Sequence, residues 1–140
     1  MISKQILTIF AIKMALEKGY NSFILTGVTG GRLDHTIATI SSLDYLSDKT
    51  KDCFIWDASS KIFIVRSEIT LKKPDFDCYL SVFSLSDNSL GVSVTGAEYP
   101  LDNAILTNNF PLGVSNEFKE DTVQISLKSG KLLVLIVKKY

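Results

Sequence analysis

The sequence lacks an excess of charge of either sign, because fifteen Lys and Arg residues balance fifteen Asp and Glu residues in a chain of 140. A chain without net charge has no overall field that attracts nucleic acid or an anionic membrane. No apolar run approaches the roughly 20 residues that a membrane span requires. We therefore expect a globular protein with neither nucleic acid nor membrane as a partner, in which a local site holds any anionic ligand.

Cysteine is also scarce, with only Cys53 and Cys78 in the chain. Their separation fits no metal-binding motif, and two cysteines are too few for a disulfide framework. We interpret both as buried or half-buried thiols, which favours a reducing, cytoplasmic location. The apolar stretch after Lys4 could be mistaken for a signal peptide, but Lys13 interrupts it, so we expect an amphipathic helix.

The first part of the chain alternates helical and strand patterns. Apolar residues at helical spacing predict a first helix that Gly19 ends, and a second helix begins after a glycine-rich turn. Each helix is followed by a short apolar run, and we expect the first run to be buried on both faces of a parallel sheet. The predicted elements are helix Ser3–Lys18, strand Ser22–Thr26, helix Asp34–Leu46 and strand Cys53–Trp56.

The rest of the chain contains short β-rich runs separated by turn residues, and no helical pattern. Ser129–Gly130 predicts a hairpin turn, and Leu132–Val137 is apolar enough for a central strand. The other predicted strands are Ile62–Arg66, Glu68–Lys72, Cys78–Ser84, Gly91–Thr95 and Thr122–Leu127. We therefore expect two domains, an α/β domain over residues 1–58 and an all-β sandwich or barrel over 59–140.

The turn before the second helix, Gly27 to Thr36, reads GVTGGRLDHT. Glycines such as Gly30 and Gly31 let backbone N–H groups approach a ligand, and a helix start adds unpaired amides and a positive dipole end. Arg32 offers a planar fork for phosphate oxygens, and Asp34 could orient a hydroxyl, accept its proton or hold a metal ion. Equally, this could be an ordinary connection in which Asp34 caps the helix.

A second polar segment, Gly113-Val114-Ser115-Asn116-Glu117-Phe118, follows Gly96 and the run Tyr99-Pro100-Leu101. The side chains of Ser115 and Asn116 can each donate and accept a hydrogen bond, which suits a neutral heterocycle, but the pair could also simply form a turn. Phe118 adjoins this pair and, with Trp56 and Phe110, could stack on a flat cationic ring, whereas packing is the plainer role.

Together these two motifs resemble the thiamine pyrophosphokinase family. The GGR-apolar-DHT run is similar to the motif that closes the nucleotide domain of that family, and the downstream segments resemble its G-x-x-YPL and G-[IV]-SNE motifs. The resemblance covers the C-terminal two thirds of a typical family member. It implies an incomplete α/β nucleotide-binding domain followed by a thiamine-binding β-sandwich.

The resemblance also implies an activity, the transfer of pyrophosphate from ATP to thiamine to give thiamine diphosphate and AMP, with Mg²⁺ assisting. Arg32 and Asp34 would be catalytic, and thiamine would contact Ser115, Asn116 and Phe118. Phosphate would be bound by Gly30, Gly31, Arg32, His35 and Thr36. The resemblance to this family also implies a homodimer, so we expect two copies of the chain to associate.

The sequence departs from the family pattern at its beginning. No Asp or Glu precedes Glu17, and Ile6 and Leu7 stand where the family has Thr and Asp, so carboxylates that would hold the metal are missing and the metal ligands stay unknown. Thr39 replaces a usual Asn. We expect a chain that is truncated at its N-terminus and inactive alone. The alternatives are a thiamine-binding module without catalysis, or a nucleotide-binding or structural protein.

Overall fold

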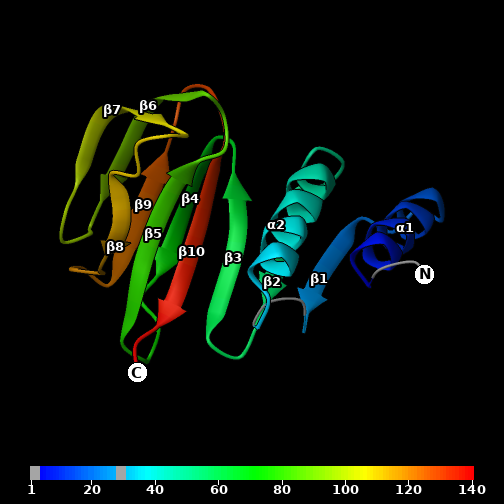
Figure 1. Cartoon of the computed structure of the whole chain (residues 1–140). Helices are drawn as coiled ribbons and strands as arrows, with labels where there is room; N and C mark the ends of the chain where they lie inside the picture. The colour runs from blue at the N-terminus through cyan, green and yellow to red at the C-terminus, as the bar shows by residue number, and fades with distance from the viewer. Residues whose placement is uncertain (1–3, 28–30) are drawn as a thin grey trace. The chain divides into compact units, whose positions relative to one another are not determined.

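The computed structural model describes residues 4–27 and 31–140, and the side chains from Thr8 onward within them. These residues form mostly β-sheet with two helices (Figure 1). By its backbone contacts the chain divides into two compact units, Met1–Ala58 and Ser59–Tyr140. None of the helices that the described residues form is long and apolar enough to cross a membrane.

The first unit contains both helices. Its elements are α1 (Lys4–Glu17), β1 (Ser22–Thr26), α2 (Leu33–Ser47) and β2 (Asp52–Trp56), which confirms the four predicted elements to within a residue or two. The end of α1 is the predicted glycine cap: Gly19 has a φ of +89°, its N–H donates to the carbonyl of Leu16, and the Tyr20 N–H donates to that of Ala15. This pair of hydrogen bonds around a left-handed glycine is a common way for an α-helix to end.

Strands β1 and β2 pair in parallel, with Ser22 opposite Asp52 and Thr26 opposite Trp56. The expected burial of β1 on both faces is wrong for this chain. Every residue of β1 is half-buried or exposed, and Ile24 is 59% exposed. Among the described strands β1 pairs with β2 alone, so one of its edges has no neighbour to cover it.

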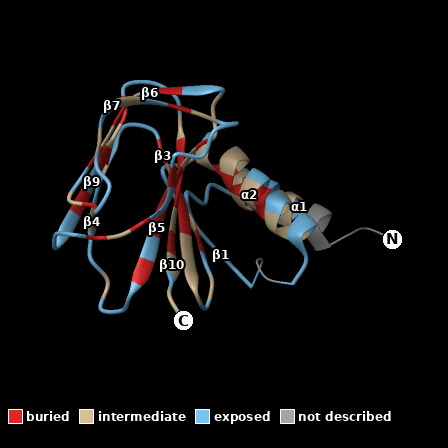
Figure 2. Cartoon of the chain, turned by 60° about the vertical axis from the view of Figure 1, so that its left-hand side comes forward, coloured by how far each residue is buried: buried red, intermediate tan, exposed pale blue. Residues whose placement is uncertain are grey.

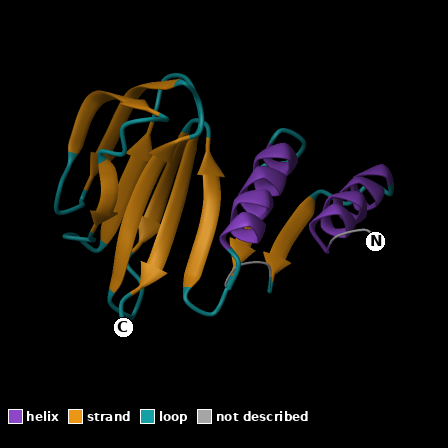
Figure 3. Cartoon of the chain, in the orientation of Figure 1, coloured by secondary structure: helices purple, strands orange, loops and turns teal. Residues whose placement is uncertain are grey.

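The second unit consists of strands without a helix, as predicted, and all of its residues are described (Figure 3). One sheet has the order β3-β10-β5-β8 and the other the order β4-β9-β6-β7. The strands are β3 (Ser60–Val65), β4 (Glu68–Lys72), β5 (Cys78–Ser84), β6 (Asn88–Thr95), β7 (Leu101–Thr107), β8 (Gly113–Asn116), β9 (Thr122–Ser126) and β10 (Leu132–Lys138).

The core of the second unit lies between its two sheets (Figure 2). Buried residues alternate with accessible ones along β9 and much of β6, whereas β5 and β10 also contain consecutive buried residues. Val92, Val123, Ile125 and Val134 are at most 1% exposed. Strand β10 lies between β3 and β5 and is antiparallel to both, which confirms the prediction of a central strand. Two antiparallel sheets with a shared apolar core form a β-sandwich, as predicted.

Two features of the second unit differ from the sequence expectations. Ser129–Gly130 is not a hairpin turn, because β9 and β10 belong to different sheets and the turn carries the chain from one to the other. Strands β7 and β8 are not predicted by the sequence pattern, since Asn108, Asn109, Pro111 and their neighbours favour turns. Both of these strands lie at sheet edges, where backbone pairing on one side alone needs little β propensity.

Candidate functional site

The predicted phosphate-binding residues gather at the start of α2. Gly31 has a φ of +79°, Arg32 has an extended backbone, and α2 begins at Leu33. Gly30 lies outside the described residues. The first-turn amides have local acceptors: the Thr36 N–H donates to the Arg32 carbonyl, and the His35 N–H donates to Asp34 Oδ1 at 3.0 Å.

Arg32 and Asp34 form a bidentate ion pair. Nε of Arg32 lies 3.1 Å from one carboxylate oxygen of Asp34 and Nη2 lies 2.6 Å from the other. The side chains are 68% and 64% exposed, so solvent screens the pair and a ligand could separate it at small cost. The hydrogen bond from Arg32 is the main cause that lowers the pKa of Asp34.

The alternative in which Asp34 caps the helix is wrong, because Arg32 occupies the cap position and makes no side-chain capping bond. Asp34 instead lies in the first turn, where its charge complements the helix dipole. His35 and Thr36 are half-buried. Thr39 is fully buried and its hydroxyl donates to the His35 carbonyl at 2.9 Å, so this side chain is directed at its own helix.

The second motif lies on β8, the edge strand next to β5. Ser115 has a φ of +59°, a left-handed conformation that residues other than glycine rarely adopt. Its N–H donates to the hydroxyl of the buried Ser81 at 3.0 Å, at a point where the register of β5 and β8 shifts. The side chain of Ser115 is exposed. The Ser81 hydroxyl thus holds the strained backbone of Ser115, and backbone strain of this kind clusters at ligand-binding positions.

Asn116 is buried and uses its amide on the main chain. Its Oδ1 accepts from the Tyr99 and Glu117 N–H groups, both at 2.9 Å, and its Nδ2 donates to the Tyr99 carbonyl at 2.7 Å. Asn116 therefore joins the two downstream motifs, one on β8 and the other at Tyr99-Pro100-Leu101. In this structure it shapes the site rather than presenting its whole amide to a ligand.

A cavity of about 90 Å³ lies where these motifs meet. It is partly enclosed and mostly apolar, and one wall comes from Tyr99 and Pro100 and another from β8. The lining residues are Val82, Val94, Tyr99, Pro100, Leu101, Leu112, Gly113, Val114 and Asn116. The cavity thus places the two segments that the sequence singled out around one space, with Ser115 on the same short strand.

The three aromatic candidates differ in exposure. Phe118 is only 9% exposed and forms a β-bridge with Ala97, so its ring packs in the second unit. Trp56 and Phe110 are 56% and 63% exposed. Tyr99, from the Tyr99-Pro100-Leu101 motif, lines the cavity and is 68% exposed. Of the aromatic residues in or near the downstream motifs, Tyr99 and Phe110 are therefore accessible and Phe118 is not.

Two glycines of the downstream motifs have steric reasons to be glycine. A Cβ on Gly96 would lie 2.2 Å from the Thr122 carbonyl oxygen, and Gly96 has a φ of +83°. A Cβ on Gly113 would lie 2.5 Å from the carbonyl oxygen of Val82 on the neighbouring strand.

The sequence does not identify Ser81 as a site residue, because a lone serine within an apolar strand does not indicate which residue it contacts.

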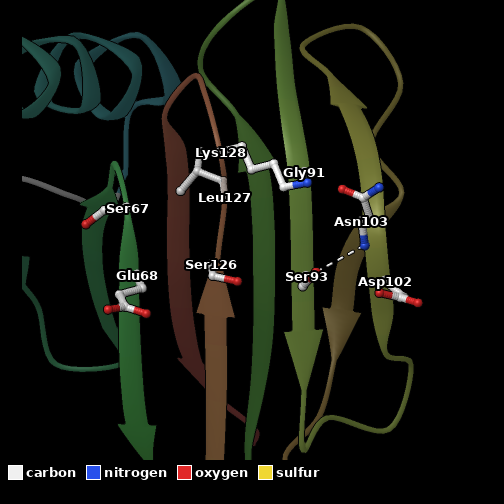
Figure 4. Close-up of a pocket in the computed structure, with 9 residues that line it drawn as sticks. All are labelled: Ser67, Glu68, Gly91, Ser93, Asp102, Asn103, Ser126, Leu127 and Lys128. Carbon is white, nitrogen blue, oxygen red and sulfur yellow. Dashed lines mark hydrogen bonds between the residues drawn. The ribbon is translucent and has the colours of Figure 1, made fainter.

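A larger groove of about 510 Å³ lies on the sheet formed by β4, β9, β6 and β7 (Figure 4). Its lining is polar, and the Asn103 N–H donates to the Ser93 hydroxyl at 3.0 Å. None of the predicted site residues contributes to it. Within the part of the chain that the structure describes, no three His, Cys, Asp or Glu side chains gather as metal ligands would.

Comparisons with known proteins agree with the motifs. The profile of the family described as "Thiamin pyrophosphokinase, vitamin B1 binding domain" matches residues 66–132. Thiamine pyrophosphokinase of Bacillus subtilis (strain 168) is 30% identical over 127 residues, which are 89% of this chain and 59% of that protein.

Solved structures are similar over almost the whole chain. The Bacillus subtilis thiamine pyrophosphokinase structure superposes with a TM-score of 0.82 at 29% identity and covers 94% of this chain and 62% of its own. The enzyme from Geobacillus thermodenitrificans has a TM-score of 0.81 at 26% identity, with 93% and 60% covered. The chain thus spans about three fifths of the length of these relatives. It belongs to the thiamine pyrophosphokinase family, of which it represents the C-terminal part.

Proposed function

We propose that residues 59–140 form a thiamine-binding domain and that thiamine binds at the edge strand β8. The observation that carries this proposal is the strained backbone of Ser115, which is exposed on the strand whose residues Val114 and Asn116 line the cavity together with Tyr99. The description of the matching family profile, a vitamin B1 binding domain over residues 66–132, supports the same assignment.

The site has the chemistry that an aromatic, cationic ligand requires. The exposed Tyr99 ring and the apolar wall of Leu112 and Val114 suit a flat ring, and aromatic faces attract cations. The Ser115 hydroxyl can donate or accept one hydrogen bond that fixes the orientation of the ring. Because Asn116 is bonded to Tyr99 and Glu117, we assign it the role of holding the site together, with at most one amide hydrogen left for thiamine.

For residues 1–58 we propose part of a nucleotide-binding domain whose phosphate site is the start of α2. The Arg32 fork and the positive end of α2 would hold phosphate oxygens of ATP, with Gly30, Gly31, His35 and Thr36 around them. To bind phosphate, the Arg32 guanidinium would break its ion pair with Asp34. Once the Arg32 guanidinium holds phosphate, the Asp34 carboxylate can accept a hydrogen bond from the thiamine hydroxyl and orient it.

Magnesium would neutralise charge on the transferred pyrophosphate, but the residues present do not form a magnesium site by themselves. Both oxygens of Asp34 face Arg32, and among the described residues Asp34 belongs to no group of three His, Cys, Asp or Glu side chains that could hold a metal ion. We propose the full reaction, from ATP and thiamine to thiamine diphosphate and AMP in the cytoplasm, for a chain that spans about three fifths of the length of its relatives.

The alternative of a thiamine-binding module without catalysis is favoured by one observation, the lack of any Asp or Glu before Glu17. Isothermal titration calorimetry and AMP formation separate the two functions. We expect the 140-residue chain to bind thiamine, Ser115→Ala to bind it more weakly, and turnover from ATP to be slow. A chain that binds no thiamine at millimolar concentration would refute the domain assignment, and rapid AMP formation would refute the binding module.

We also propose that the protein is a homodimer. The exposed apolar side chains of Tyr99, Leu112 and Val114 beside the unpaired edge of β8 support an interface there. Sedimentation equilibrium checks this, with a mass of about 31 kDa expected for two chains of 15.5 kDa each. A mass of one chain at micromolar concentration would contradict it.

A further inference from the structure

Strand β8 is short and its backbone pairing is incomplete. It spans four residues, lies at the edge of its sheet, and pairs with β5 only at Gly113 and Asn116 around a register shift. A strand with so few ladder bonds depends on side chains to fix its position. Two such side chains are the Ser81 hydroxyl, which accepts from the Ser115 N–H, and the Asn116 amide, which bonds to the backbone of Tyr99.

A third link lies directly after the Ser115–Asn116 pair. The Glu117 carboxylate accepts a hydrogen bond from Nζ of Lys139, which makes this an ion pair between partly exposed side chains. The same ammonium lies 4.7 Å from the centre of the Tyr79 ring. The pairing with Glu117 is the main cause that raises the pKa of Lys139.

The register explains why these side chains meet. Asn116 is opposite Leu80 on β5, so Glu117 follows on toward Tyr79, and Tyr79 is opposite Val137 on β10. Lys139 is fixed by its backbone, because its N–H donates to the Asp77 carbonyl at 2.9 Å. A lysine anchored beside the central strand β10 thus reaches across β5 to the end of the edge strand.

We propose that Lys139 is a positioning residue for thiamine: through Glu117 it holds the Ser115–Asn116 segment of β8 in its binding conformation. This inference rests on the function proposed above. The Tyr79 ring contributes by stabilising the ammonium between β5 and β8. Lys139 does not line the cavity beside β8, so its effect on thiamine would pass through Glu117.

The chain offers a matched control in the neighbouring lysine. Lys138 also lies over an aromatic ring, with Nζ 5.7 Å from the centre of Phe76, and it is exposed. Replacing Lys138 removes the same charge from the same end of the same strand without touching Glu117. A difference between the two lysines therefore reports the ion pair rather than the loss of net charge.

The test measures thiamine affinity by calorimetry in the full 140-residue chain. We expect Lys139→Met and Glu117→Gln each to weaken binding by about three- to five-fold, the range of a partly exposed ion pair. The double variant should be no weaker than either single one, since both remove the same link. Lys139→Arg should restore most of the affinity, and Lys138→Met should bind like the unaltered chain.

Amide hydrogen exchange at Ser115 and Asn116 provides a readout that does not need thiamine. Exchange should accelerate in Lys139→Met and Glu117→Gln and stay unchanged in Lys138→Met. If the unaltered chain binds no thiamine, the proposed function fails, while the exchange rates still decide whether Lys139 orders β8. Equal exchange in Lys139→Met and the unaltered chain, or additive losses of affinity in the double variant, would overturn the proposal.

Discussion

Replacing Asn116 with alanine removes the side chain that joins β8 to the Tyr99 segment. The amide makes three hydrogen bonds to main-chain groups and is only 6% exposed. A net contribution of about 1 kcal/mol per bond, and more where a buried group is left without a partner, gives a loss of about 3 kcal/mol in the free energy of unfolding. That is a large share of the stability of a small domain, which is about 5–15 kcal/mol.

Urea unfolding, followed by circular dichroism of the β-sheet, measures this loss. With a slope of about 2 kcal/mol per molar urea, the midpoint should fall by about 1.5 M. Asn108→Ala is the control, because Asn108 is exposed and its amide makes a single long contact of 3.5 Å to Asp87, so its effect should stay within about 0.5 kcal/mol. A loss below about 1 kcal/mol for Asn116→Ala would refute the role of this amide as the link between the motifs.

Asn116→Asp refines the same test. The carboxylate keeps the acceptor for the Tyr99 and Glu117 N–H groups but opposes the Tyr99 carbonyl, where Nδ2 now donates. Burial and this carbonyl should raise the pKa of the new carboxyl in the folded state. Its destabilising effect should therefore be absent below the unfolded pKa of about 3.9 and should grow as the pH rises through that value. A pH-independent loss would contradict this.

Three further predictions concern single positions. Ser115→Gly should raise stability by roughly 0.5 kcal/mol, because glycine adopts a φ of +59° without strain, yet it should weaken thiamine binding; an unchanged affinity in calorimetry would remove Ser115 from the site. Gly96→Ala should lower the free energy of unfolding by about 3 kcal/mol or more, since its Cβ would lie 2.2 Å from the Thr122 carbonyl oxygen. A melting temperature equal to that of the unaltered chain would contradict this clash. Burial raises the pKa of the Cys78 thiol, so the thiol has no effect on stability while it is neutral in both states and destabilises the folded state as the pH rises above the ordinary thiol pKa. In a Cys53→Ser background, iodoacetamide should alkylate Cys78 far more slowly in the folded chain than in urea, and equal rates would refute its burial.

Much of the secondary structure could be predicted because local patterns decide it. Gly19 ends α1 as its position after a helical run indicates, and the apolar Leu132–Val137 run becomes the central strand β10. The partner of a strand is not a local property. The residues of Ser129–Gly130 therefore favour a hairpin turn, although β9 and β10 pair with other strands in separate sheets.

In the candidate site, too, local motifs could be predicted from the sequence and contacts between distant residues could not. The order of the motifs identifies Ser115 and Asn116, and the structure adds that Asn116 holds the backbone of Tyr99, seventeen residues away. Ser81 and Lys139 could not be found, because their partners Ser115 and Glu117 are 34 and 22 residues distant and only strand register brings them together. A sequence pattern locates the start of a helix only to within a residue or two, so Asp34 could be interpreted as the N-cap of α2. In the structure Arg32 occupies the N-cap position.

The most direct test of the central claim is to map thiamine on the chain by titrating ¹⁵N-labelled protein and following amide chemical shifts. Binding at the β8 edge predicts that the largest changes occur at Tyr99, Leu112, Ser115 and Asn116. The amides of Ser93, Asn103 and Lys128, in the polar groove on the other sheet, should hardly move. Shifts concentrated in that groove, or no saturable shifts at millimolar thiamine, would contradict the assignment of β8 as the thiamine site.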